Sequence, residues 1–134
     1  MTQCGGQLLL LPYPPSLNHY YRHVGFRTLI SREGRAYRQA VCVTLRRAGV
    51  RLMVGPLAMG IDLYPPDRRR RDADNAQKAL LDALQHGRAY RDDSQVRKLL
   101  TIMREQVVAG GRAIVCILPL EPSTIKDIQH ETAS

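Results

Sequence analysis

Large hydrophobic residues recur at two spacings along the chain, every second position in some segments and every third or fourth in others. A run of leucines, Leu8–Leu11, ends at the proline-rich stretch Pro12–Pro15, which predicts a first strand followed by an extended loop. The segment 57–64, LAMGIDLY, alternates between large apolar residues and others, and Pro65–Pro66 end it. Both segments are therefore predicted to be strands.

Two longer segments carry apolar residues at helical spacing. The stretch 32–48 follows Ser31, a residue suited to cap a helix, and Gly49 ends it. A second stretch begins near Asp74 and ends at Gly87. The apolar stripe of this second stretch consists of Ala76, Ala79, Leu80, Ala83 and Leu84. We therefore expect two amphipathic helices, the first with an arginine-rich exposed face.

Two more candidate strands lie within 96–108 and 112–118. They flank Ala109–Gly110–Gly111, a turn sequence that predicts a hairpin. The predicted order is strand, helix, strand, helix, strand, strand, so we expect one α+β domain over residues 1–120, with a mixed sheet and two main helices. Residues 121–134 lose both periodicity and hydrophobic density, and we expect them to be a mobile tail.

Composition and charge narrow the range of partners. The chain has 134 residues, of which 44% are hydrophobic, enough for one core without disulfides or a structural metal. Lys and Arg number 20 against 12 Asp and Glu, which gives a formal net charge of +8. Such a surplus favours nucleic acid as a partner, because each basic contact with a phosphate releases counterions.

The cysteines and the N-terminal stretch bear on the cellular compartment. The three cysteines, Cys4, Cys42 and Cys116, are an odd number and lack C-x-x-C spacing, which indicates reduced, buried thiols. The first residues contain no basic region, and their run of four leucines is too short for a signal peptide or a membrane span. We therefore expect a cytoplasmic protein with no membrane partner.

Two aspartates stand at the predicted start of the second helix. Asp72 and Asp74 are two positions apart, so in an extended approach to the helix both side chains point the same way. Helix capping is one explanation, since Asp74 with Gln77 fits a capping box. A cap needs only one carboxylate, however, so the pair also suggests a metal site.

A second acidic pair, Asp92 and Asp93, follows the helix and precedes the next strand. One interpretation is an ordinary turn, which Asp and Ser favour. The other is that a strand end, a helix start and the next strand start share one rim of the sheet. Three carboxylates gathered there would suit Mg²⁺, which also takes substrate phosphate as a ligand and assists phosphodiester hydrolysis.

Basic residues surround the first acidic pair. Lys78 lies one turn after Asp74, either as a solvated partner of Asp74 and Asp82 or as a group that stabilises charge on a phosphate. Arg68, Arg69, Arg70 and Arg71 form a solvated face, a localisation tract, or a contact surface for the DNA backbone. The last interpretation explains why arginines adjoin carboxylates, since bringing phosphate to acids requires compensating positive charge.

We expect a long loop over residues 17–30, and its segment 18–27 mixes aromatic and basic residues. This combination suits stacking on unpaired bases together with phosphate contact, although a loop packed on the core by its tyrosines is an equal alternative. The candidate DNA-binding residues are Asn18, Tyr20, Tyr21, Arg22, His23 and Arg27. His19 and His23 lack the partners that a zinc site needs, so neither is predicted to be a ligand.

Taken together, these motifs resemble those of the RusA-type Holliday junction resolvases (crossover junction endodeoxyribonucleases), small endonucleases often carried by prophages. The resemblance runs through LPYPPSLNHYYRH, SREGRAYR and PDRRRRDADNAQKALLDAL to DDSQV. Its most specific elements are D-x-D-N-x-x-K, from Asp72 to Lys78, and the following D-D-x-Q-V, from Asp92 to Val96.

The resemblance implies a Mg²⁺-dependent homodimer, with Mn²⁺ able to substitute, that acts in recombination and repair by cutting four-way DNA junctions with paired, symmetric nicks. Asp72, Asp74 and Asp93 then look like catalytic metal-binding acids, Lys78 looks like a catalytic lysine, and Asp92 matches a further family acid that could bind metal. No small-molecule cofactor is implied. The alternatives are a module that binds branched DNA without cutting it, and a nucleotidyl-transfer or nucleotide-hydrolysing enzyme. The chain lacks a Gly-rich phosphate loop, which counts against the nucleotide enzyme.

Overall fold

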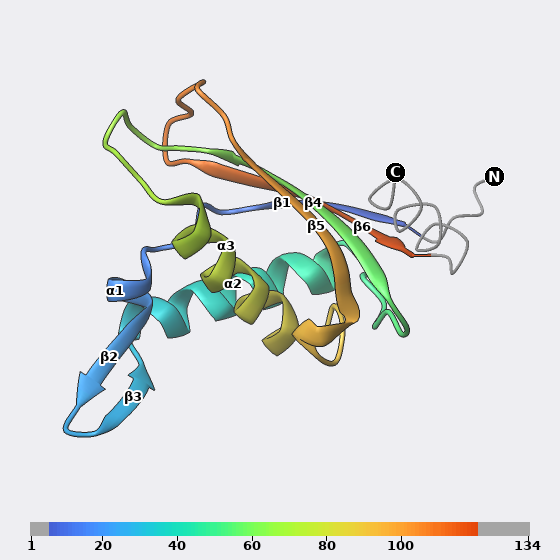
Figure 1. The fold of residues 1–134 in the computed structure, drawn as a ribbon, viewed down its shortest axis with the longest axis horizontal. Coiled ribbons are helices and arrows are strands. Elements are labelled where there is room, and N and C mark those ends of the chain that lie inside the picture. The colour runs from blue at the N-terminus through green and yellow to red at the C-terminus, as the bar shows by residue number, and fades with distance from the viewer. Residues whose placement is uncertain (1–5, 121–134) are drawn as a thin grey trace, which may run out of the picture.

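A four-stranded mixed sheet organises residues 6–120, the part of the chain that the computed structural model describes. Its strands lie in the order β1 (Gln7–Leu11), β6 (Arg112–Pro119), β4 (Leu57–Tyr64) and β5 (Val96–Met103) (Figure 1). β6 runs antiparallel to both of its neighbours, whereas β4 and β5 are parallel. These strands pack with helices in one compact domain, so the predicted α+β fold with a mixed sheet is confirmed.

Two helices cover one face of this sheet, α2 (Arg32–Arg47) and α3 (Ala73–His86) (Figure 1). Successive side chains of a strand point to opposite faces, so every second residue of β4 lies beneath the helices and is at most 3% exposed. The predicted apolar stripe of α3 is buried as well. Each fully buried aliphatic side chain contributes about 1.5–3 kcal/mol, so this layer holds α3 against the sheet.

β5 and β6 follow one another in the chain but do not pair, so the predicted hairpin is wrong. β5 lies beside one edge of β4 and β6 beside the other. The connection 104–111 crosses the end of β4, where the Arg104 amide donates to the Leu63 carbonyl at 2.8 Å. The glycine turn does reverse the chain, but β4, with its long regular alternation, takes the central place between the two strands.

The unit β4–α3–β5 determines where the acidic motifs lie. Parallel strands require a crossover connection, and α3 supplies it. α3 therefore runs back across the sheet, with its first turn near the end of β4 and its last turn near the start of β5 (Figure 1). Consequently, Asp72 and Asp93 belong to opposite rims of the sheet.

The segment 17–30, predicted to be a loop, contains regular structure. A short helix, α1 (Leu17–Tyr20), leads into β2 (Tyr21–Val24), which pairs antiparallel with β3 (Arg27–Ile30). Gly25 has a φ of 62°, which glycine adopts readily, and it permits a two-residue turn. The loop prediction was wrong because these strands are short and mostly polar. The hairpin projects away from the body of the molecule (Figure 1).

Within residues 6–120, no other element covers the sheet face away from α2 and α3. Exposed leucines occur on this face in three strands, at Leu8, Leu10, Leu100 and Leu118. Exposed apolar groups of this kind are typical of surfaces that bind other molecules.

Cys42 and Cys116 are free thiols, but both are partly exposed, so the prediction that they are buried is wrong. Cys4 and the predicted tail 121–134 lie outside the described residues. Over residues 6–120, no helix combines the length and the hydrophobicity needed to cross a membrane.

Candidate active site

The first acidic pair sits at the N-terminus of α3. Asp72 is the N-cap, and its Oδ1 accepts a hydrogen bond from the Asp74 amide at 3.0 Å. Asp74 lies in the first turn, and both residues are exposed. The predicted capping box of Asp74 and Gln77 is therefore wrong, because the helix begins earlier than expected. The Gln77 side chain instead accepts a hydrogen bond from the Thr101 hydroxyl at 2.6 Å and ties α3 to β5.

The arginines of the run 68–71 have two different roles. Arg71 Nη1 pairs with Asp67 Oδ1 at 2.6 Å, and its guanidinium lies 5.8 Å from the centre of the Tyr13 ring. The hydrogen bond from Arg71 holds the pKa of Asp67 down at about 2, and the Arg69 amide adds to this effect. Arg71 thus shapes the loop. Arg68, Arg69 and Arg70 are exposed to solvent and open to contact phosphate.

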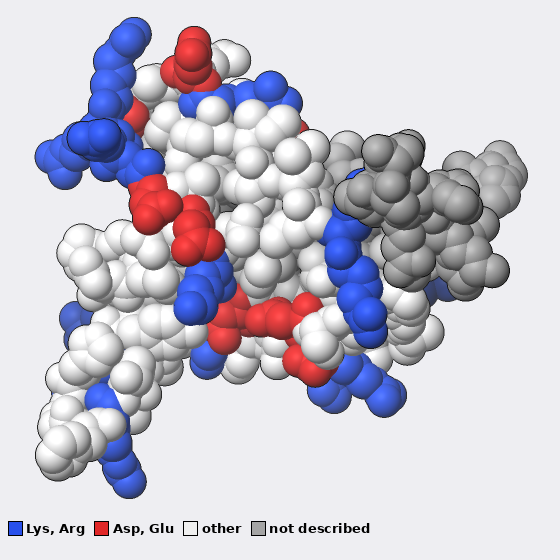
Figure 2. Space-filling view, in the orientation of Figure 1, with Lys and Arg blue, Asp and Glu red and all other residues white. Residues whose placement is uncertain are grey.

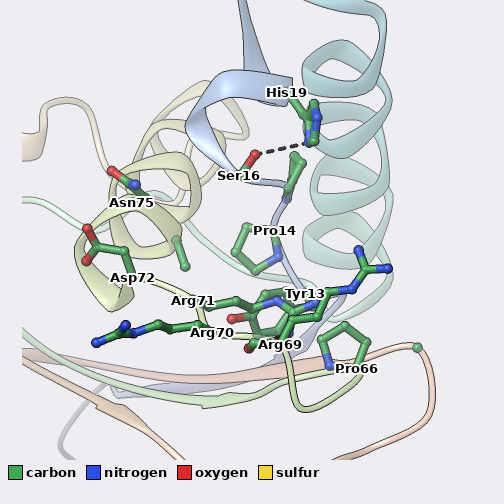
Figure 3. A pocket seen from close by; sticks show the side chains of 13 residues that line it. Tyr13, Pro14, Ser16, His19, Pro66, Arg69, Arg70, Arg71, Asp72 and Asn75 are labelled. Atoms are coloured by element: carbon green, nitrogen blue, oxygen red, sulfur yellow. Dashed lines mark hydrogen bonds between the residues drawn. The ribbon is translucent and has the colours of Figure 1, made fainter.

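A pocket joins the arginine loop to the acidic pair (Figure 3). Arg69, Arg70, Asp72 and Asn75 line it from one side, and the segment 13–19 lines it from the other. In this segment the His19 ring nitrogen Nδ1 lies 3.1 Å from the Ser16 hydroxyl. One carboxylate, Asp72, and three arginines therefore line one hollow, in which an anionic ligand and a cation bound to that carboxylate would be neighbours.

The second acidic pair belongs to a 3₁₀ turn, η1 (Asp93–Gln95), beside the last turn of α3. The Asp93 amide donates to the Gln85 side chain at 3.0 Å. Desolvation raises the pKa of Asp93, a hydrogen bond from Tyr90 opposes this shift, and the charge of Asp82 adds to it. The Asp92 carboxylate accepts a hydrogen bond from the Ser94 hydroxyl at 2.6 Å, which lowers the pKa of Asp92.

The two acidic pairs do not meet within one chain. α3 has 14 residues and is about 21 Å long, with Asp72 at its start and Asp93 beside its end. Among residues 6–120, no three His, Cys, Asp or Glu side chains gather closely enough to hold a metal ion. The expectation that a strand end, a helix start and the next strand start share one rim is wrong, because β4 and β5 are parallel. The roles of these acids stay predictions.

Lys78 and Asp82 lie on successive turns of α3 but have different surroundings. Asp82 accepts hydrogen bonds from Arg38, with Nη2 at 2.9 Å, and from the Tyr20 hydroxyl. Among the described residues, Lys78 makes no ion pair with Asp74 or Asp82, contrary to one alternative, and its side chain is exposed. Lys78 is thus available for a partner outside the chain.

Tyr20 is fully buried, so its prediction as a DNA contact is wrong. Burial raises its pKa, and the hydrogen bond to Asp82 adds to this rise. Its ring packs edge-on against Tyr21 at 4.8 Å between centroids. The other candidates of this region, Asn18, Arg22, His23 and Arg27, are exposed, and Tyr21 is partly buried. The alternative of a tyrosine packed on the core holds for Tyr20.

Gln95 positions the second acidic pair, a role the sequence patterns did not reveal. Its side-chain oxygen accepts hydrogen bonds from the Arg91 amide at 2.8 Å and the Asp92 amide at 3.1 Å. Its side-chain nitrogen donates to the carbonyls of Met53 and Gly55, both at 3.0 Å. The glutamine of D-D-x-Q-V was the available signal, since a glutamine side chain has both an acceptor and donors and can bridge backbone groups.

Charge is distributed unevenly over the face that carries α3 (Figure 2). Acidic side chains gather over α3 and its two ends, and basic side chains project beyond them over the loop 67–71 and the β2–β3 hairpin. A long polyanion laid across this face would meet arginines on both sides of the acids, because the two basic groups flank α3.

Known proteins are similar in sequence to this chain. The family model described as Endodeoxyribonuclease RusA matches residues 12–117. The crossover junction endodeoxyribonuclease RusA of Escherichia coli strain K12 is 43% identical over 105 residues, which cover 78% of this chain and 87% of that protein. The crossover junction endodeoxyribonuclease rusA of Enterobacteria phage 82 is 45% identical over 107 residues, with the same two shares, 78% and 87%.

The RusA of Escherichia coli O139:H28 strain E24377A is 39% identical over 113 residues, covering 84% of this chain and 93% of that protein. The match includes nearly all of the described fold, from the end of β1 into β6. The chain therefore belongs to the RusA family of endodeoxyribonucleases, and the resemblance inferred from its motifs is confirmed.

Proposed function

We propose that this protein is a divalent-metal-dependent endonuclease that resolves Holliday junctions, using Mg²⁺ or in its place Mn²⁺. It acts as a homodimer in the cytoplasm and makes paired, symmetric nicks during recombination or repair. Membership of the RusA family supports the junction as substrate, because the similar proteins from Escherichia coli and phage 82 carry the name crossover junction endodeoxyribonuclease. The symmetry of the substrate supports two equivalent sites.

One observation carries the proposal. The exposed carboxylates Asp72 and Asp74 stand at the first turn of α3, and Asp72 shares a pocket with Arg69 and Arg70. A protein that bound DNA only through charge would place arginines, not carboxylates, against the phosphates, because carboxylates repel phosphate. Acids beside a phosphate-binding surface are expected where a cation intervenes.

The pair fits Mg²⁺. This ion is usually bound by one or two carboxylates, with water and substrate phosphate as its remaining ligands, so it does not require three acids from one chain. Asp72 keeps one oxygen outside the capping hydrogen bond, and neither oxygen of Asp74 is engaged in a hydrogen bond among the described residues. Bound there, Mg²⁺ would polarise the phosphodiester and lower the pKa of attacking water.

The basic side chains act on the same phosphodiester. Arg68, Arg69 and Arg70 draw the backbone toward α3 and fix its position, as phosphate contacts do in protein–DNA complexes. Lys78 lies one turn beyond Asp74, and its ammonium group forms no ion pair with any of the described residues. It would donate hydrogen bonds to the phosphate oxygens and stabilise the charge that accumulates on them in the transition state.

Asp93 requires a different account, with Asp92 beside it. In a single chain Asp93 lies beside the last turn of α3 and does not share a metal site with Asp74. We propose that Asp93 of a second copy completes the site, which would give the homodimer a catalytic as well as a symmetric role. The open sheet face and the free edge of β5 are two surfaces that a second copy could cover.

Incubation of the protein with a labelled four-way junction tests the function directly. We expect two symmetric nicks in Mg²⁺ or Mn²⁺, little cutting in Ca²⁺ and none in EDTA, because the larger Ca²⁺ tolerates looser coordination. A linear duplex of the same sequence is the substrate control and should stay intact. Undiminished cutting in EDTA would exclude the metal-dependent mechanism, and binding without any cutting would favour the non-catalytic module. Light scattering should give about twice 15.1 kDa.

A further inference from the structure

Phe26 occupies the tip of the β2–β3 hairpin and is fully exposed. It stands at the second position of the two-residue turn that Gly25 opens, so no other part of the hairpin extends past it. An exposed phenylalanine leaves a large apolar ring in water, without the polar group that Tyr or Trp carries. The ring is therefore available to a partner outside the chain.

The hairpin is firmly rooted. The Ser31 amide and the Ser31 hydroxyl both donate to the carbonyl of the buried residue Tyr20, each at 2.9 Å. Gly34, in the first turn of α2, lies so close that a Cβ there would clash with the Tyr20 carbonyl oxygen and approach Ile30 Cγ1 at 2.7 Å. A rigid base of this kind holds the tip at a fixed distance and direction from α3.

Arginines flank the apolar tip on one face of the hairpin. Cross-strand pairing sets Arg22 opposite Leu29 and Val24 opposite Arg27, and these four side chains share a face. All four are exposed. Guanidinium groups on both strands just behind an aromatic tip would let the ring enter an apolar space while the arginines contact a charged surface around it.

We propose that Phe26 is a wedge that inserts at the branch point of a DNA junction and stacks on an exposed base pair. This inference rests on the proposed junction function and adds the residue that reads the branch. Where four arms meet, the base pairs at the crossover expose faces. In a continuous duplex, stacking on the next base pair covers these faces. Apolar side chains, phenylalanine among them, are inserted between base steps by other DNA-bending proteins.

The surrounding charge selects DNA over a protein partner. Arg22 and Arg27 adjoin the tip, and the loop 67–71 supplies further arginines at the other end of the α3 face (Figure 2). An apolar protein surface would leave the two hairpin guanidinium groups without anions, whereas a phosphate backbone on either side of an opened base step provides them. Stacking on a base also tolerates any sequence at the branch.

The test uses a four-way junction that carries 2-aminopurine in place of adenine beside the branch point, with EDTA present to prevent cutting. Binding of the parent protein should raise the fluorescence, because the inserted ring unstacks the probe base. Phe26→Ala should abolish this rise and weaken junction binding about tenfold, the order expected for loss of one base–aromatic stack. Affinity for linear duplex, measured by anisotropy, should not change. Phe26→Leu keeps an apolar wedge and should retain the signal.

Val54→Ala is the matched control, since it trims another exposed apolar side chain outside the hairpin. It should leave both readouts at the parental level. The wedge is excluded if Phe26→Ala binds the junction as tightly as the parent with the same fluorescence rise, if it loses junction and duplex affinity equally, or if it changes the mass of the free protein in light scattering. A parent protein that neither prefers nor cuts junctions would instead overturn the proposed function.

Discussion

The two ends of α3 carry exposed aspartates in different electrostatic surroundings. At its first turn, Asp72 and Asp74 are exposed and share their neighbourhood with free arginines. Beside its last turn, Asp93 is near Asp82 and Tyr90, and desolvation raises its pKa. The first end is suited to hold a cation next to phosphate. The second end disfavours its own negative charge, which a cation or a positively charged neighbour from another molecule would relieve.

The largest difference between the ends should appear in Asp74→Asn. Asparagine is nearly isosteric, but it removes an anionic ligand, so we expect cleavage to fall by at least about two orders of magnitude. Junction affinity should stay the same or increase, because a negative charge leaves a surface that meets phosphate. Glu33→Gln, an exposed carboxylate in the first turn of α2, is the control and should cut normally. Near-parental cutting by Asp74→Asn would remove this residue from the metal site.

Mixed dimers decide whether the two ends work together across copies. Asp74→Asn and Asp93→Asn should each be inactive alone. If Asp74 of one copy and Asp93 of the other form one site, a mixed dimer contains one intact site and should nick one strand of the junction. If each chain forms its own site, every site in the mixture is damaged and no nicking returns. Gel analysis of a junction labelled on each strand in turn distinguishes the two results.

The arginines at the first end should dominate the salt dependence. Replacing Arg69 and Arg70 together by alanine should reduce the slope of log affinity against log salt concentration by about 2, since each lost phosphate contact removes about 0.9. Replacing Arg46 and Arg47, exposed at the end of α2, serves as a charge-matched control. An equal slope for the first double variant and its parent would show that the arginine loop does not contact the DNA backbone.

Capping can be separated from metal binding at Asp72. Asp72→Ala should lower the free energy of unfolding by about 1 kcal/mol, because the Asp74 amide loses its acceptor, whereas Asp72→Asn should change it little. Both variants should lose cleavage. Chemical denaturation of the two proteins provides the comparison, and an asparagine variant that still cuts would leave the cap as the whole role of Asp72.

The smallest expected effect is a pH-dependent one at Asp93. Its pKa is raised in the folded protein, so the ionised carboxylate destabilises the fold and this penalty develops as the pH rises through and above 3.8, the ordinary value. Asp93→Asn should therefore raise Tm slightly at pH 7, and the difference should vanish below that ordinary value. A variant less stable than its parent at pH 7 would contradict the assigned shift.

Strong local patterns predicted much of this fold. The alternation in β4 and the apolar stripe of α3 identified both elements, because each pattern matches one secondary structure only. The parallel pairing of β5 with β4, in place of a hairpin with β6, could not be predicted from the sequence. Strand pairing depends on contacts between segments far apart in sequence.

Prediction of the site failed at the same step. The aspartates were found by their motifs, but their shared rim was inferred from an arrangement that parallel strands forbid. The hairpin was missed as well, because the polar residues Arg22, His23 and Thr28 interrupt any alternation in its strands. Sequence patterns thus identified the chemically important residues, but they did not predict how far apart these residues lie.

Gly34 has a consequence for how this region tolerates change. A glycine within a helix costs about 0.5–1 kcal/mol relative to alanine, yet here any side chain would collide with the Tyr20 carbonyl. Val24, Phe26 and Arg27 are exposed, so a library randomised at these three positions, with Gly25 kept for the turn, should yield mostly folded proteins. Substitution of one buried glycine would shift the whole hairpin. Variation in reach and specificity can therefore accumulate at the tip while its root stays invariant.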